Sequence, residues 1–252
     1  MKTQFGAAML AAVSALAGNP GAEPKTFRSG ETKTSVLELY TSEGCSSCPP
    51  AERWLSGLKE NPRLWKDLVV ISFHVDYWND LGWKDPLARP GFSERQRLYS
   101  TQWHANAVYT PGFILDGKEW KGWFQQKALS PASNEKAGVM SATSTGPDTW
   151  TVSFQPMENK TAEKISISAA LLGFELTSRV RAGENNGKTL KHDFVTLQFA
   201  TSQAKPIGRS FETTFTAPSN PKLASQRLAV VFWATKGENM QPIQAVGGWI
   251  GE

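Results

Sequence analysis

The only two cysteines of the chain, Cys45 and Cys48, are separated by two serines. A strand-like run precedes this pair, and a helix-like run that begins with two prolines follows it. In a strand–turn–helix context, a C-x-x-C spacing is typical of a redox pair. The first thiol would lie at the helix N-terminus, where unpaired N–H groups and the helix dipole favour a thiolate. We therefore expect Cys45 to be the catalytic nucleophile and Cys48, about one turn further on, to resolve the mixed disulfide.

A carboxylate in the strand before the cysteines is the predicted proton acceptor. Glu38 lies within the apolar run of residues 36–40. From a strand behind the cysteines, its carboxylate would take the proton of Cys48 through a water molecule. The alternative is a carboxylate that faces outward from the strand and has no part in the chemistry.

Two alternatives to redox chemistry stay open from the residues. Cys45, Cys48 and His74 form a donor set suited to Cu(I), since thiolates select soft ions, although the chain has only three histidines and no Met-rich tract. In the other alternative, the disulfide is merely structural and the C-terminal half is a binding module. The main prediction, thiol–disulfide exchange, requires no cofactor and no metal ion.

Several other polar and aromatic residues carry weaker signals. His74 ends an apolar run, where a histidine is more often hydrogen-bonded in the core than a ligand. Asp76, Tyr77 and Trp78 come after it and are suited to lining a substrate groove, although aromatic residues in such a loop also serve as packing. The sequence indicates no site at His104 or His192, nor at Glu184 and Asn185, which are expected in a turn.

The N-terminus has the plan of a secretory signal peptide. Residues 1–17 contain a lysine, an apolar stretch and a small-x-small ending. The stretch is short for a bilayer span, and no later segment is apolar enough for one. We therefore expect cleavage, a periplasmic or secreted location, and no stable membrane span afterwards. In an oxidising compartment the small loop that C-x-x-C closes would contribute little stability, which favours a chemical role.

The apolar pattern divides the rest of the chain in two. After a flexible lead-in over residues 18–34, strand-like runs at 36–40 and 68–75 flank a helix-like run at 51–58, which is a β-α-β unit. Further helices are expected over 93–103 and 125–140. Residues 141–148, rich in Ser, Thr, Gly and Pro, are the predicted linker between a domain at 35–140 and one at 149–252.

Regularly spaced, strand-like runs fill the second domain and predict an all-β antiparallel sandwich. The formal net charge of the whole chain, +4 over 252 residues, is small and not clustered, so a nucleic-acid partner has little support.

Four motifs in order give the chain a family resemblance. With Cys45, Cys48, Thr110 and Pro111 in place, the first domain resembles the thioredoxin superfamily, and the chain is similar to the DUF1223 family of exported bacterial proteins of unknown function. The resemblance implies a thioredoxin-like α/β domain followed by the β-sandwich. It also implies that Pro111 follows a cis peptide bond opposite the cysteines, with Thr110 flanking an extended substrate. The motifs are TSEGCSSCPPA (41–51), HVDYW (74–78), YTP (109–111) and GENNGKTL (183–190).

The predicted function is therefore a thiol–disulfide oxidoreductase acting on exported proteins. Its substrates would be protein thiols or disulfides, and it would need an unidentified redox partner. The direction of electron transfer does not follow from the sequence, because known C-x-x-C proteins span about 150 mV.

Overall fold

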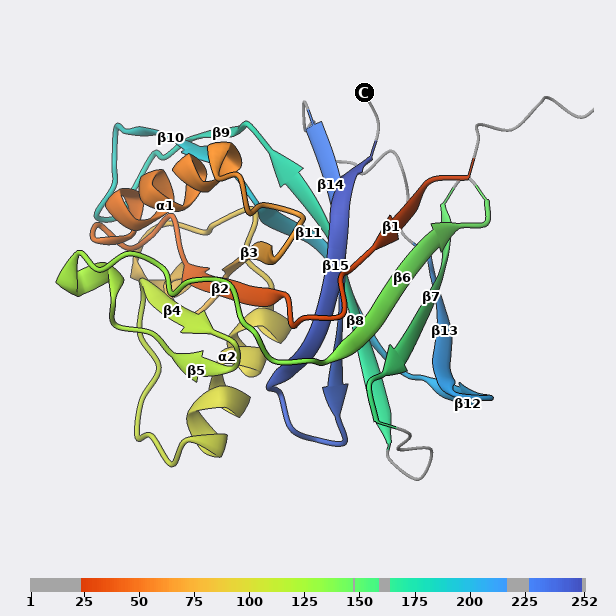
Figure 1. Cartoon of the computed structure of the whole chain (residues 1–252). Helices are drawn as coiled ribbons and strands as arrows, with labels where there is room; N and C mark the ends of the chain where they lie inside the picture. The colour runs from red at the N-terminus through yellow and green to blue at the C-terminus, as the bar shows by residue number, and fades with distance from the viewer. Residues whose placement is uncertain (1–23, 147, 159–163, 217–226, 251–252) are drawn as a thin grey trace, which may run out of the picture.

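An eight-stranded mixed sheet is the largest element of the computed structural model, which describes residues 24–146, 148–158, 164–216 and 227–250 (Figure 1). The strands follow the spatial order β15, β14, β8, β11, β3, β2, β4 and β5. All neighbours are antiparallel except two pairs, β11 with β3 and β3 with β2. The bounds are β2 Ser35–Thr41, β3 Leu68–His74, β4 Gly112–Leu115, β5 Lys118–Glu119, β8 Ile165–Phe174, β11 Val195–Gln203, β14 Arg227–Lys236 and β15 Pro242–Ile250.

The two strands that lead to the cysteines are buried along their whole length. Every residue of β2 and β3 is buried, as expected of mainly apolar parallel strands that are covered on both faces. Their register places Thr41 opposite His74, so both strands end at the same edge of the sheet. On the other side of β3, Val195 at the start of β11 pairs with Ser72.

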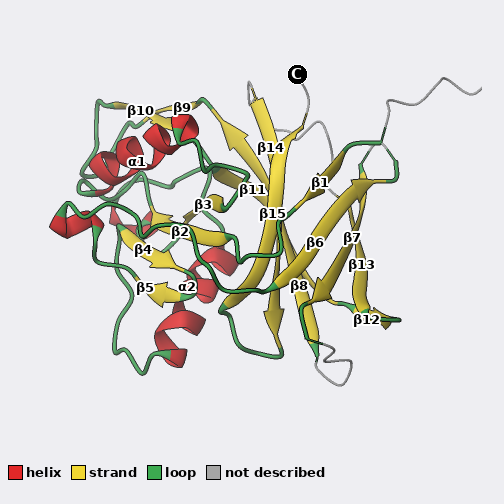
Figure 2. Ribbon diagram, in the orientation of Figure 1, coloured by secondary structure: helices red, strands yellow, loops and turns green. Residues whose placement is uncertain are grey.

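A second sheet of five strands packs against the C-terminal part of the large one (Figure 2). In β7 the residues Trp150, Val152 and Phe154 are buried and alternate with half-buried ones, so one face of the strand lies in the core. That core includes Val230 and Phe232 of β14. The order is β1 Thr26–Arg28, β6 Gly138–Ser144, β7 Thr149–Pro156, β13 Ser210–Thr216 and β12 Lys205–Ile207.

Two α-helices and a hairpin surround the other end of the large sheet (Figure 1). Helix α1, Cys48–Gly57, begins at the second cysteine with two prolines in its first turn, where a missing N–H breaks no hydrogen bond. Helix α2 spans Pro90–Gln102. The hairpin strands are β9, Leu176–Arg179, and β10, Thr189–His192, and β10 contacts α1. Short 3-10 helices cover Leu58–Glu60, Asn79–Leu81 and Trp123–Gln125. No helix within the described ranges has the length and apolar character to span a bilayer.

The predicted fold, an α/β thioredoxin-like domain followed by a separate all-β antiparallel sandwich, is wrong. The described chain is mostly β-strand, with only two short α-helices. Strand β11 from the C-terminal half lies beside β3, and the sheet continues from it through β8, β14 and β15. The physical reason is that β3, apolar and buried throughout, needs a neighbour on each side, and β11 supplies the second one.

Other predicted segments also differ from the structure. The helix expected over residues 125–140 is absent, and the chain there runs from the end of a 3-10 helix through irregular backbone into β6. Of residues 141–148, predicted as a linker, residues 141–144 form the second half of β6, which pairs with β7. The lead-in over 18–34 contains β1, which pairs with β6. The predicted signal peptide, residues 1–17, lies outside the described residues.

Candidate functional site

The two cysteines lie in one turn directly beneath the surface. Cys48 is the first residue of α1, and its backbone N–H donates to the carbonyl of Cys45 at 3.2 Å. Both are free thiols and both are buried, with 1% and 0% of their area exposed. Ser46 and Ser47 between them are exposed. The pair is therefore covered by a thin layer of neighbouring residues.

The two thiols differ strongly in acidity. A hydrogen bond from the Cys48 thiol lowers the pKa of Cys45 to about 6, and the Ser47 hydroxyl, 3.2 Å from Cys45 Sγ, adds to this against the opposing effect of burial. Burial, and then the neighbouring Cys45, raise the pKa of Cys48 well above its usual value. At neutral pH this arrangement favours a thiolate at Cys45 and a protonated thiol at Cys48.

The predicted substrate-binding residues lie next to the first cysteine. The Thr110–Pro111 peptide bond is cis, as expected, and the carbonyl oxygen of Thr110 is 3.7 Å from Cys45 Sγ. Strand β4 begins directly after Pro111 and pairs with β2, which leads into the cysteine turn. Trp78, for which the sequence left groove lining and packing open, donates from its indole N–H to Thr110 Oγ1 at 2.8 Å.

A loop that the sequence marked only as a turn is hydrogen-bonded to the backbone of the cysteine turn. We call residues 183–187, between β9 and β10, the cover loop. The side-chain amide of Asn185 donates to the carbonyls of Glu43 at 2.8 Å and Cys45 at 2.9 Å. Glu184 accepts from the backbone N–H of Ser46 at 2.8 Å, and this bond lowers the pKa of its carboxyl. The cover loop thus holds the cysteine turn through at least three hydrogen bonds.

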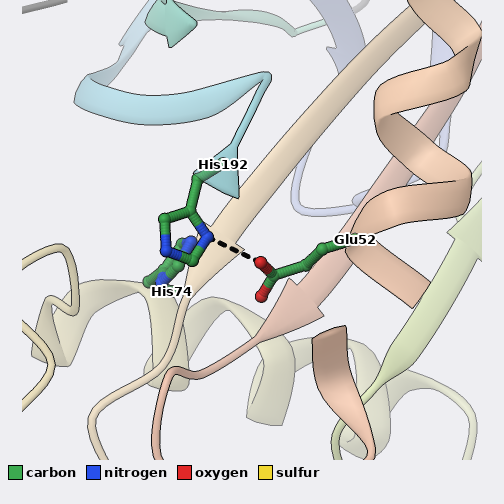
Figure 3. Close-up of side chains that lie close together, drawn as sticks. All are labelled: Glu52, His74 and His192. Atoms are coloured by element: carbon green, nitrogen blue, oxygen red, sulfur yellow. Dashed lines mark hydrogen bonds and ion pairs between the residues drawn. The ribbon is translucent and has the colours of Figure 1, made fainter. Parts of the chain in front are cut away.

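Beneath the cysteines lies a buried cluster of charged and imidazole side chains (Figure 3). Glu52 projects from α1, His74 from the end of β3 and His192 from the end of β10, and one potential ligand atom from each lies within 4.8 Å of the other two. His192 Nδ1 is 2.6 Å from Glu52 Oε2, and its Nε2 is 3.2 Å from Glu43 Oε1. On the outer side, His74 Nδ1 is 2.7 Å from Asp85 Oδ2.

The charges of this cluster depend on one another. Burial opposes ionisation of Glu52 and Asp85, but the neighbouring histidines hold the pKa of both carboxyls below its usual range. Burial also opposes protonation of His192, but the carboxylate of Glu52 and then that of Glu43 raise its pKa to about 10. The cluster is consequently held together by mutual attraction inside the protein.

The carboxylate that is connected to the cysteines by hydrogen bonds is Glu52, not Glu38, the predicted proton acceptor. Thr41 donates to Glu52 and also hydrogen-bonds the Cys48 thiol, so its hydroxyl links the cysteine to the cluster. Glu38 instead forms a buried ion pair with Arg95, with N–O distances of 2.9 and 3.0 Å, and accepts from Tyr40 and Tyr99. Glu52 follows Cys48 by four residues, a spacing that puts two side chains on the same face of a helix. This spacing is the sequence signal that could have identified Glu52 as a neighbour of Cys48.

Two variants of Cys48 test the origin of the acidity of Cys45. Cys48→Ala removes the donor that contributes most to the lowered pKa, so we expect the pKa of Cys45 to rise from about 6 toward the ordinary cysteine value of about 8.5. Cys48→Ser keeps a hydroxyl donor and should leave the pKa near 6. The pH dependence of thiolate ultraviolet absorbance measures both. Equal midpoints in the two variants would contradict this assignment.

A variant of the cover loop tests how the thiol is protected. Asn185→Ala removes three side-chain hydrogen bonds, two of them to the cysteine turn and each of those contributing about 0.5–1.5 kcal/mol, so we expect iodoacetamide to modify Cys45 about tenfold faster than in the wild type. The measurement is made well above the pKa of Cys45, so that only access differs. Asn186→Ala, an exposed neighbour in the same loop, is the matched control and should react at the wild-type rate. An unchanged rate in Asn185→Ala would show that the cover loop does not limit access.

Comparison with known proteins gives one family and two solved structures of similar fold. A crystal structure of an Agrobacterium tumefaciens protein matches with a TM-score of 0.60 and 25% identity, over 88% of this chain and 96% of that one. HBP35 of Porphyromonas gingivalis matches in fold with a TM-score of 0.59 and 14% identity, over 87% of this chain and 76% of that one. A search of curated proteins found no match. The family model described as "Protein of unknown function (DUF1223)" matches residues 36–234, and the chain therefore belongs to the DUF1223 family.

Proposed function

We propose that this protein is a thiol–disulfide oxidoreductase that exchanges disulfides with exported proteins. The observation that carries the proposal is the pair of unlike thiols at the start of α1. Cys45 has a pKa of about 6, and Cys48, its hydrogen-bond donor, keeps its proton. A thiolate beside a protonated thiol is the arrangement that disulfide exchange requires.

The proposed reaction begins with the protein in its dithiol form. The Cys45 thiolate attacks one sulfur of a substrate disulfide, forms a mixed disulfide and releases the first substrate sulfur as a thiolate. Cys48 then attacks Cys45 Sγ, its proton passes to the departing second sulfur of the substrate, and the Cys45–Cys48 disulfide forms. Two electrons move from the protein to the substrate, and the reverse sequence oxidises a substrate dithiol.

Thr110 and Pro111 have the position needed to orient a substrate. The carbonyl of Thr110 faces Cys45 Sγ at 3.7 Å. We propose that an extended substrate chain lies along this segment and pairs with its backbone, which would direct the substrate sulfur toward Cys45. Because Cys45 is 1% exposed, the residues around it must rearrange before exchange, and we propose that the cover loop is the part that moves.

Variants of the two cysteines test the proposed function. We expect Cys45→Ser to reduce insulin reduction and refolding of a reduced disulfide protein to the uncatalysed rates, because no thiolate attacks. Cys48→Ala should instead accumulate a mixed disulfide on Cys45, visible by mass spectrometry, because nothing resolves it. Ser46→Ala, in the same turn, keeps both thiols and should keep activity. If wild type and Cys45→Ser give equal rates in both assays, the proposal is wrong.

We further propose that the mature protein is exported. The proposal rests on the signal-like pattern of residues 1–17 and places the thiols where disulfides persist. In cells that express the full chain, the protein should be recovered from the periplasm or medium with its N-terminus near Gly18. Mass spectrometry measures this directly. Recovery of the intact N-terminus from the cytosol alone would contradict export.

A further inference from the structure

We infer that Glu52, His74 and His192 bind one divalent transition-metal ion, of which Zn²⁺ is the best match, and that the ion fastens β10 and the cover loop to α1. The three side chains come from three elements that are far apart in the sequence. Their potential ligand atoms lie within 4.8 Å of one another, and all three residues are buried. The inference does not rest on the proposed function.

Unsatisfied polar atoms meet at this place. Among the described residues, His74 Nε2, His192 Nε2 and Glu43 Oε1 are buried and have no hydrogen-bond partner. His192 Nε2 and Glu43 Oε1 face each other as an ion pair at 3.2 Å, whereas His74 Nε2 has no such partner. A buried polar atom without a partner costs about 1–3 kcal/mol, so His74 Nε2, which has neither a hydrogen bond nor an ion pair at this atom, points to a missing ligand.

Outer partners already orient the proposed ligands. Asp85 Oδ2 lies 2.7 Å from His74 Nδ1, which leaves Nε2 as the free ring nitrogen of His74, and Asp85 itself accepts from the backbone N–H groups of Glu43 and Leu87. Thr41 holds Glu52 Oε1, which leaves Oε2 toward His192. A carboxylate behind a ligating histidine, and a hydrogen bond behind a ligating carboxylate, are the usual second shell of a metal site.

The donor set selects the kind of ion. Two imidazoles and one carboxylate suit zinc, which three such protein ligands bind with a fourth position left for water or another group. Calcium and magnesium prefer oxygen ligands only. In a tetrahedral zinc site, neighbouring ligand atoms are roughly 3.3 Å apart. Small side-chain rotations would therefore close the 4.8 Å spread and open the 2.6 Å contact between His192 and Glu52. His192 would bind the ion through Nδ1, the nitrogen that faces Glu52, and Glu43 Oε1 lies at its other ring nitrogen, behind this ligand as Asp85 lies behind His74.

Such an ion would link the cysteine helix to its cover. Glu52 lies one turn after Cys48 on α1, and the cover loop leads directly into β10, which ends at His192. The metal bonds would therefore join both sides of the closed arrangement and lower the frequency of its opening. The cysteines are not among the residues of this group, so the site differs from the Cu(I) set of Cys45, Cys48 and His74.

The experiment uses the full-length chain, first stripped by a chelator and then titrated with Zn²⁺ or Co²⁺ alone. We expect one equivalent to bind and to raise the melting temperature. The Cys45→Ser/Cys48→Ser double variant and His104→Gln, which changes an exposed histidine, should bind like the wild type. His74→Gln, His192→Gln and Glu52→Gln should each bind at least about 100-fold more weakly, and Asp85→Asn about 10- to 100-fold more weakly.

The Co²⁺ spectrum of the wild type keeps the test decisive even where a variant fails to fold. Nitrogen and oxygen ligands give visible d–d bands without the intense near-ultraviolet band of thiolate ligands. That spectrum, with one equivalent bound, supports the inference. Binding of less than one equivalent, a thiolate band, or loss of binding in the double-cysteine variant would overturn it. In that case the cluster is an ion-pair network or the metal belongs to the thiols.

Discussion

The position of β3 between β2 and β11 is the constraint on which the rest of the site depends. Because β2 and β3 are parallel and in register from Ser35–Leu68 to Thr41–His74, both end at the same edge of the sheet. That edge receives the cysteine turn from β2 and His74 from β3. Strand β11 begins beside Ser72, so the segment before it, with His192, must pass the same edge. One buried strand thus brings three distant parts of the chain together.

Local patterns were enough to predict the cysteine side of the site. The spacing of Cys45 and Cys48, the apolar run before them and the prolines after them define a strand, a turn and a helix start without any tertiary information. The cis bond before Pro111 and its position beside Cys45 were predicted from the family resemblance and are confirmed. These features are local or carried by a motif, which is why the sequence revealed them.

What the sequence did not reveal depends on pairing between distant segments. Periodicity identifies a strand but not its neighbour, so the insertion of β11 beside β3, and with it the position of His192 and Asn185, had no signal. The expected helix over 125–140 was a propensity argument, and propensity is a weak prior against tertiary context. Glu38 was assigned a role at the cysteines because a strand carboxylate was expected behind them. In a strand buried on both faces, a carboxylate needs a cation as its partner. Arg95 is that cation, and the ion pair holds the Glu38 carboxylate.

The acidity of Cys45 bears on the direction of the proposed exchange. A pKa of about 6 in place of the ordinary value of about 8.5 stabilises the dithiol form at pH 7 by about 1.4 kcal/mol, which for two electrons raises the reduction potential by about 30 mV. Known C-x-x-C pairs span about 150 mV, so this contribution favours disulfide donation but covers only a fifth of the range. The hydrogen bond from Cys48 is the main cause of the low pKa of Cys45, so its effect on the potential is already included in this contribution. Cys48 donates to Cys45 only in the dithiol form, whereas Asn185 holds the backbone of Cys45, which disulfide formation leaves in place. The hydrogen bond between the thiols therefore favours the dithiol form, and the cover loop acts mainly on access.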